Sequence, residues 1–255
     1  MMETIGKHIV RIPVLDSTNR YFMDWLTREE PEEGTIVITD RQTSGKGMDG
    51  NAWESEPGKN LTFSFVLYPH FLAPDAQFYL NKIVALGLSD LVSSFLPGQE
   101  NIRIKWPNDI YINDLKVAGT LIQNGIKGSV IDYAVVGIGL NVNQEAFSGA
   151  AANPVSMKII SGKEFDLDTM LEKAVEKIEH WYDLLKKGIK KDIDEAYLGR
   201  LYRYQQLADY VYKGSTIRAK ITGVNRYGQL VLEIPGEKII ECDLKEIACL
   251  TPQPP

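Results

Sequence analysis

The chain has 255 residues, 44% of them hydrophobic, and its 28 basic and 34 acidic side chains give a formal net charge of −6. The length fits one large domain or a large and a small one, and the acidic balance argues against a protein whose main affinity is for nucleic acid or an anionic membrane. Two cysteines cannot form a disulfide framework, and the sequence has no apolar signal or membrane-spanning run, so we expect a cytoplasmic protein with reduced thiols.

The first half of the sequence predicts helices and strands in an α+β arrangement. A helix is expected behind the N-cap residues at 16–19, ending before Pro31. Strands are expected at 34–40 and at 61–67, where apolar and small polar residues alternate as in a strand with one buried face. Helical spacing of apolar residues then predicts a long helix over 77–96.

Strands follow that long helix. They are expected at 102–106, 110–112, 117–123 and 130–138. Thr169 and Glu172 have the spacing of a capping box, which predicts a helix from 169 to 185, and a second short helix is expected over 193–202.

The pattern changes after residue 207, where turns separate short strand-like runs and no helical spacing occurs. These runs lie at 210–212, 216–224, 229–234 and 238–242. Short strands with frequent turns indicate a small all-β barrel. We therefore expect two domains, 1–206 and 207–255, and a disordered tail over 251–255.

A glycine-rich loop carries the first candidate site. Residues 45–50 match the G-x-G-x-x-G pattern, but Pro57 and Gly58 stand where the required helix would run, so a Rossmann site is excluded. The loop offers backbone N–H groups, lysines and Trp53, which can close over an anionic ligand. The alternative is a surface loop whose glycines only make turns.

Three further segments end or cross predicted strands. In the segment 105–109, Asn108 and Asp109 present an amide and a carboxylate at a strand end, or simply form a turn. Lys116 lies in an apolar strand, on the face predicted to hold Ala118, Thr120 and Ile122, either at an edge or directed into a pocket as a fixed positive charge. The glycines and asparagines of 137–143 indicate close approach of a ligand or another backbone, or a strand-end turn.

These motifs, in this order, resemble the catalytic core of biotin protein ligases. The matching residues are Ser17 and Thr18 at the first helix, Gln42 with the glycine-rich loop and Trp53, Lys105 to Asp109, Lys116 to Leu121, and Gly137 to Asn141. The resemblance runs from about residue 10 to the end, because the terminal β region resembles the SH3-like domain of those ligases. It implies an α+β, class II synthetase-like fold, with a mixed β-sheet and helices, followed by a small SH3-like β-barrel.

The resemblance also implies a reaction and its ligands. Biotin and ATP would give biotinyl-5′-AMP and pyrophosphate, with Mg²⁺, and biotin would pass to a lysine of the biotin carboxyl carrier domain of a carboxylase. Lys116 and Asp109 would be catalytic. The residues implied for biotin are Ser17, Thr18, Gln42, Gly45, Lys46, Lys116 and Gly119. Those implied for ATP are Gly47, Gly50, Trp53, Asn108 and Asn141, with Asp109 and Asn141 as candidates for Mg²⁺.

One departure from the family concerns the loop, which is usually rich in arginine. Here it has Lys46, Met48, Asp49 and Asn51, and lysine supplies a point charge but no bidentate fork. Only fifteen residues precede Asp16, so we expect no DNA-binding domain and no repressor function. The alternatives are a lipoate- or octanoate-type protein acyl ligase and a non-catalytic biotin-binding module; the sequence does not predict the oligomeric state.

Overall fold

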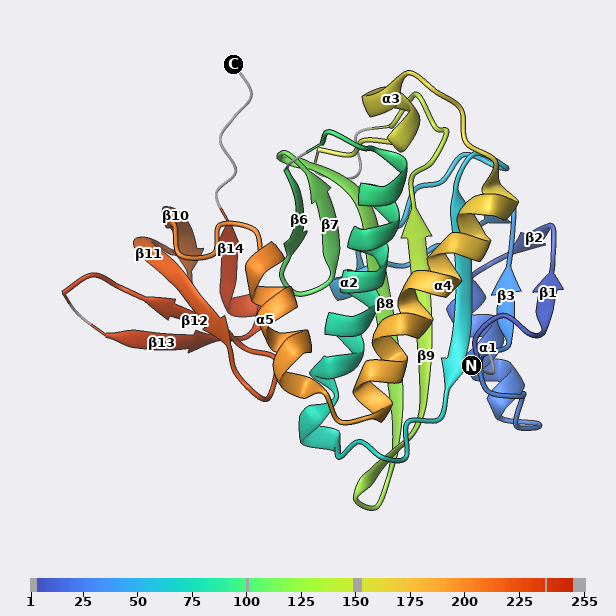
Figure 1. Ribbon diagram of the computed structural model, residues 1–255, viewed down its shortest axis with the longest axis horizontal. Coiled ribbons are helices and arrows are strands. Elements are labelled where there is room, and N and C mark those ends of the chain that lie inside the picture. Colours follow the sequence, from blue (N-terminus) through green and yellow to red (C-terminus); the bar gives the residue numbers. More distant parts are fainter. Residues whose placement is uncertain (1–3, 100, 149–152, 237, 250–255) are drawn as a thin grey trace.

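The structure is a computed structural model that describes residues 4–99, 101–148, 153–236 and 238–249. Its centre is a sheet of seven strands (Figure 1). In chain order these are β1 (Ile9–Arg11), β3 (Ile36–Ile38), β5 (Leu61–Leu67), β6 (Ile102–Lys105), β7 (Asp109–Ile112), β8 (Leu115–Lys127) and β9 (Val130–Leu140). Their order across the sheet is β1-β3-β5-β9-β8-β7-β6; β1 and β3 are parallel and the other neighbours antiparallel. The predicted mixed sheet is confirmed.

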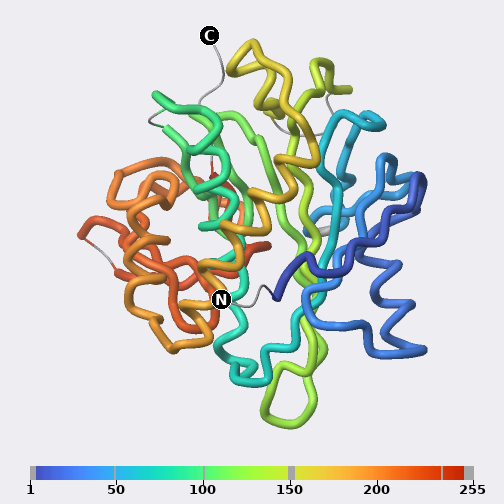
Figure 2. Tube along the Cα trace, turned by 45° about the vertical axis from the view of Figure 1, so that its right-hand side comes forward, coloured from blue at the N-terminus to red at the C-terminus, as the bar shows by residue number. Residues whose placement is uncertain are grey.

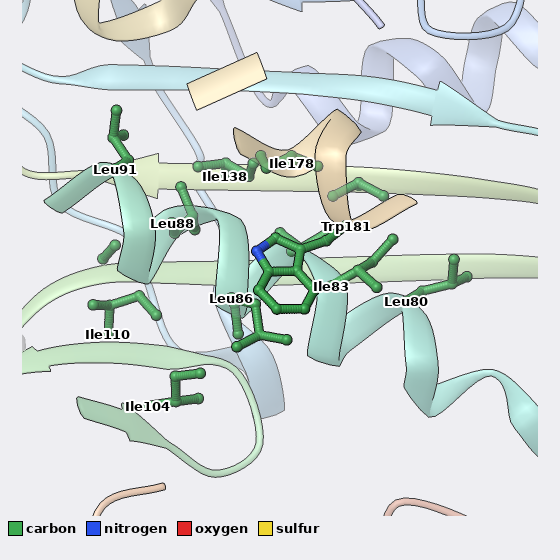
Figure 3. Close-up of a cluster of buried hydrophobic side chains, with 14 of the residues drawn as sticks. Leu80, Ile83, Leu86, Leu88, Leu91, Ile104, Ile110, Ile138, Ile178 and Trp181 are labelled. Atoms are coloured by element: carbon green, nitrogen blue, oxygen red, sulfur yellow. The ribbon is translucent and has the colours of Figure 1, made fainter. Parts of the chain in front are cut away.

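Helices cover both faces of this sheet. The helices α2 (Phe78–Phe95) and α4 (Leu167–Lys186) pack together on one face, and α5 (Lys190–Arg200) contacts both of them. Figure 3 shows the core on that face, where α2 and α4 meet the strands. The side chains drawn there include Leu80, Ile83, Leu86, Leu88, Leu91, Ile104, Ile110, Ile138, Ile178 and Trp181. The helix α1 (Thr18–Leu26) packs on the opposite face, where Phe22 contacts Val37, Val66 and Val135.

This two-sided cover explains one wrong prediction. Alternation predicted that β5 has one buried face, but all seven of its residues are buried. β5 lies between β3 and β9 with helices on both sides, so its small polar side chains are enclosed too. Ser64, for example, is fully buried and hydrogen-bonded to α1.

The predicted helices are confirmed, with corrections at two helix starts; α5 begins at Lys190, three residues before the predicted start at 193. α1 begins behind Ser17, whose side chain accepts a hydrogen bond from the backbone N–H of Arg20 (3.5 Å). α4 begins two residues earlier than the predicted capping box, because Asp166 is its N-cap and accepts from the N–H of Thr169 (2.8 Å). A carboxylate at this position both satisfies a free N–H group and interacts favourably with the helix dipole. A further short helix, α3 (Met157–Ser161), was not predicted.

The last strands form a separate antiparallel sheet, here called the β module. Its strands are β10 (Leu207–Tyr212), β11 (Ser215–Val224), β12 (Leu230–Glu233), β13 (Ile239–Cys242) and β14 (Ile247–Cys249). Their order is β13-β12-β11-β10-β14, consistent with the expected SH3-like domain; β14 was not predicted. Cys242 and Cys249 are free thiols. The predicted tail 251–255 lies outside the described residues.

The β module lies beside the β6–β7 edge of the central sheet (Figures 1 and 2). The indole N–H of Trp106 donates to the carbonyl of Gly228 (2.8 Å), and a Cβ at Gly228 would lie only 2.5 Å from the Phe78 ring. Since Gly228 also has φ +90°, only glycine fits this contact. The short strands β2 (Val14–Leu15) and β4 (Arg41–Gln42) pair separately, near α1. Across the four described ranges, no helix is both long enough and apolar enough to cross a bilayer.

Candidate active site

A cavity of about 520 Å³ opens on the α1 face of the central sheet. Strands β7 to β9 form its floor, the start of α1 and the loop 42–54 form one side, and the β module forms the other. All the residues that the sequence resemblance implies for the site line this cavity except Gly45 and Gly50. The module contributes Ile221, Leu230, Leu244, Ile247, Ala248 and Cys249.

An ion pair stands at the centre of the cavity floor. Lys116 Nζ lies 2.7 Å from Asp109 Oδ1, and the two side chains are 25% and 19% exposed. The same ammonium lies 5.7 Å from the Trp53 ring centroid. Gly119 makes room for the pair, since a Cβ there would be 3.1 Å from Asp109 Oδ1 and 3.2 Å from Lys116 Nζ. Lys116 is therefore directed into the cavity, which decides between the two alternatives for it.

The strand face predicted for Lys116 is wrong, and a β-bulge is the reason. Ile110 pairs with Ala118, but the next residue, Tyr111, pairs with Lys116, so Val117 is an extra residue in β8. The bulge buries both Val117 and Ala118 and places Lys116 on the same side as Gly119. Simple alternation had assigned Lys116 to the face of Ala118.

A polar cluster lines the α1 side of the cavity. Gln42 Oε1 accepts hydrogen bonds from the backbone N–H of Thr18 (2.8 Å) and from its hydroxyl (3.2 Å). Ser64 Oγ lies 2.6 Å from Thr18 Oγ1 and 2.7 Å from Asn19 Oδ1. Asn19 in turn donates to the carbonyl of Leu121 (3.1 Å). These side chains hold one another in fixed orientations, which suits recognition of a polar ligand ring.

Two glycines of β9 give other side chains access to the sheet. A Cβ at Gly139 would lie 2.2 Å from Trp53 Cε2, so the indole rests directly on the strand. A Cβ at Gly137 would lie 2.1 Å from Asn19 Oδ1. The glycines therefore serve close approach and not merely a strand-end turn. Trp53 Nε1 is buried without a hydrogen-bond partner among the described residues.

The glycine-rich loop folds back over the cavity. Lys46 and Ala52 form an antiparallel bridge, and the N–H of Trp53 donates to the carbonyl of Gly45 (3.0 Å). A Cβ at Gly45 would lie 2.8 Å from Gln42 Nε2, and Gly50 has φ +80°. These two glycines thus shape the loop without lining the cavity, whereas Gly47 lines it.

The two asparagines that line the cavity, Asn108 and Asn141, make different hydrogen bonds. Asn108 donates through its side chain to the carbonyl of Thr120, and Thr120 N–H donates back to the Asn108 carbonyl (3.1 Å). Asn141 Nδ2 donates to the Val155 carbonyl (3.1 Å), but its Oδ1 is buried with no partner among the described residues. Those same residues contain no cluster of three or more His, Cys, Asp or Glu side chains suited to a metal. Asn141 Oδ1 and Asp109 instead offer isolated oxygen ligands.

Lys105 lines the cavity and was not among the predicted site residues. Its Nζ donates to the Tyr111 hydroxyl (3.0 Å), and burial raises the pKa of that hydroxyl, which therefore stays neutral. Alternation along 102–106 already placed Lys105 opposite the core residue Ile104, so a signal existed. No local sequence pattern predicts which residues of the β module line the cavity, because this wall depends on the docking of two distant segments.

A sequence profile of the biotin/lipoate A/B protein ligase family matches residues 11–141, just over half of the chain. The chain belongs to this family. The matched range ends at Asn141 and contains the Lys116–Asp109 ion pair and Trp53.

Relatives and solved structures extend the similarity beyond that range. This chain is 25% identical to the bifunctional ligase/repressor BirA of Escherichia coli, over 91% of this chain and 71% of that protein. It is 28% identical to the biotin–[acetyl-CoA-carboxylase] ligase of Paracoccus denitrificans, over 80% of this chain and 86% of that one. The biotin protein ligase of Aquifex aeolicus, solved with biotin and ATP, superposes with a TM-score of 0.78 at 25% identity, over 95% of this chain and 98% of that chain.

Proposed function

We propose that this protein is an ATP-dependent biotin protein ligase. It converts biotin and ATP to biotinyl-5′-AMP and pyrophosphate and then transfers biotin to a lysine. The observation that carries this conclusion is the Lys116–Asp109 ion pair (2.7 Å) beside Trp53, on the floor of a cavity of about 520 Å³. A cavity of this size accommodates two small reactants side by side. The similar Aquifex aeolicus protein was solved with biotin and ATP together.

In the first step a carboxylate oxygen of biotin attacks the α-phosphorus of ATP, and pyrophosphate leaves. Two anions meet, so negative charge accumulates on the oxygens around phosphorus. Lys116 stabilises that charge with an ammonium that is already in place. Asp109 orients Lys116, and Lys46 and Lys105 add positive charge along the same cavity.

We assign the biotin ring to the polar cluster at α1. Ser17, Thr18 and Gln42 supply hydroxyl and amide groups for the ring, and Gly119 and Lys46 border the path toward Lys116. Gly45 acts indirectly, by letting the loop close against Gln42. The hydrogen bonds among Thr18, Gln42 and Ser64 fix these groups before the ligand arrives, which lowers the entropy cost of binding.

We assign ATP to the side of the cavity nearer the β module. Trp53 covers the adenylate and excludes water from the mixed anhydride, while Gly47 lines the cavity without a side chain and lets the nucleotide approach the loop closely. Gly50 acts by shaping the loop, and Asn108 acts by fastening the β6–β7 turn to β8. Asn141 Oδ1, buried without a partner, and the Asp109 carboxylate fit a hard cation that prefers oxygen ligands, so these two would hold Mg²⁺. Mg²⁺ supplies neutralisation of phosphate charge when bound.

In the second step the amine of an acceptor lysine attacks the carbonyl carbon of the adenylate, and AMP leaves. We propose a biotin carboxyl carrier domain as acceptor and the cytoplasm as location. We also propose that residues 1–206 form the catalytic domain and 207–255 a separate SH3-like domain that completes the nucleotide side of the cavity.

The decisive experiment is pyrophosphate–ATP exchange with biotin, lipoate or neither, followed by transfer to a purified carrier domain. Biotin-dependent exchange with transfer is the expected result. Exchange with lipoate instead would identify a lipoate-type ligase, and tight biotin binding without exchange would identify a binding module. Either result would overturn the proposal.

A further inference from the structure

Two chain segments that are far apart in sequence meet at the mouth of the cavity. The first, 54–56, follows the glycine-rich loop, and the second, 144–148, follows β9. The backbone N–H of Ser148 donates to Glu54 Oε1 (2.8 Å), and the Ser148 hydroxyl donates to Glu54 Oε2 (2.6 Å). Glu54 and the neighbour of Ser148, Phe147, both line the cavity. One carboxylate thus joins the two segments by two hydrogen bonds.

A second contact joins the same segments deeper in the protein. Gln144 is only 1% exposed, and its Oε1 accepts from the N–H of Glu56 (3.0 Å) and from Asn60 Nδ2 (2.6 Å). The Glu54–Ser148 bonds are exposed, by contrast. Exposed hydrogen bonds open at lower free energy than buried ones. The segments should therefore part first at Glu54–Ser148 and pivot near Gln144.

Loss of the Glu54–Ser148 contact would directly affect the position of the Trp53 indole. Glu54 follows Trp53 in the chain, and the Trp53 ring rests on Gly139 and lies near Lys116. A release of Glu54 frees the backbone that positions that ring. The cover over the reacting atoms then depends on the Glu54 carboxylate, although Glu54 itself contacts no reacting atom.

We propose that Glu54 and Ser148 form a latch that holds the two segments closed over the activated intermediate and limits its escape. Glu54 is a positioning residue in this proposal, which rests on the proposed ligase function. Two hydrogen bonds to an ionised acceptor at a surface contribute enough to slow opening by about tenfold. Adenylate release should thus respond strongly to Glu54, while the chemistry at Lys116 should not.

The test measures release of labelled biotinyl-AMP. Each enzyme forms the adenylate from labelled biotin and ATP, is passed through a desalting column, and is chased with unlabelled biotin and ATP. We expect Glu54→Ala to speed release about tenfold and Ser148→Ala about threefold, because the latter keeps its backbone N–H. Single-turnover adenylation should stay within about twofold. Ser148→Thr retains both donors and should behave as the wild type.

The double variant separates a latch from general damage to the loops. Partners in one interaction are not additive, so Glu54→Ala with Ser148→Ala should release no faster than Glu54→Ala alone. Glu56→Ala is the matched control, since it removes the same charge two residues away and its side chain bonds to no described residue. Unchanged release in Glu54→Ala, or additive effects, would overturn the latch. Failure of the wild type to form labelled adenylate would instead overturn the ligase function.

Discussion

The two faces of the central sheet perform different tasks with residues that are neighbours in sequence. Toward α2 and α4, the strands present isoleucines to a sealed apolar core (Figure 3). Toward α1, the adjacent residues line the cavity: Lys105 stands beside Ile104, and Asp109 beside Ile110. Because strand side chains alternate between faces, one step along the chain leads from a residue that packs in the core to a residue that lines the cavity. Stability and activity should therefore be separable by single substitutions one residue apart.

The largest effect on the cavity face is expected from Lys116→Ala. Removing a preorganised positive charge from a developing anion should lower biotin-dependent pyrophosphate–ATP exchange by at least about 100-fold. The melting temperature should change by less than about 2 °C, since Lys116 is not part of the apolar core. Lys127→Ala, at the exposed end of β8, is the control and should retain full exchange. Near-normal exchange by Lys116→Ala would remove Lys116 from the mechanism.

A smaller effect on the same face is expected from Gly139→Ala. The new Cβ would occupy the space of the Trp53 indole, which must shift off the strand. We expect KM for ATP to rise about tenfold in the exchange assay, because small displacements in a site cost binding and rate. Gly199→Ala in α5 has no neighbour within 4 Å and should leave KM unchanged. An unaltered KM in Gly139→Ala would show that the indole position is unimportant.

On the core face, Ile110→Ala tests the other half of the comparison. The fully buried side chain leaves a cavity, and the free energy of unfolding in urea should fall by about 3 kcal/mol. KM for biotin should change less than twofold, although Asp109 is the adjacent residue. A large rise in KM with little loss of stability would contradict the separation of the two faces.

The smallest effect is expected from Asp166→Ala at the start of α4. The hydroxyl and backbone N–H of Thr169 donate to this carboxylate and hold its pKa below the usual value of 3.8. The ionised cap stabilises the folded protein above that pH, and its contribution is lost as the pH falls through the lowered pKa. The variant should melt about 2 °C lower at pH 7, and the difference should shrink below pH 3.8. A difference independent of pH would contradict this role.

The elements with long regular patterns were predictable from the sequence. α1, α2, α4 and the strands β5 to β9 all have repeated apolar spacing over enough residues to be recognised. β1, β2, β4 and β14 were not predicted, because each has only two or three residues and no clear apolar pattern of its own. The N-cap of α4 was predicted at Thr169, because Thr169 and Glu172 match a capping box. In the structure the N-cap is Asp166, which precedes that motif and accepts the hydrogen bond from the Thr169 N–H.

The resemblance to biotin protein ligases predicted most of the residues named for the cavity. The orientation of a side chain and the contacts between distant segments were less predictable. Trp53, Asp109 and Lys116 were each named from sequence, and the structure brings them together. The strand face of Lys116 was wrong because a bulge cannot be read from alternation. The latch joining Glu54 to Ser148 had no sequence signal, since each residue is an ordinary polar residue in a loop.

The Lys116–Asp109 ion pair has a consequence for an enzyme that acylates lysines. An activated acyl group reacts with any free amine, and in the proposed mechanism the enzyme's own Lys116 lies where that group would form. As an ammonium bound to Asp109, Lys116 has no lone pair and does not attack. The carboxylate that orients Lys116 in this proposal would thus also protect it from becoming a substrate.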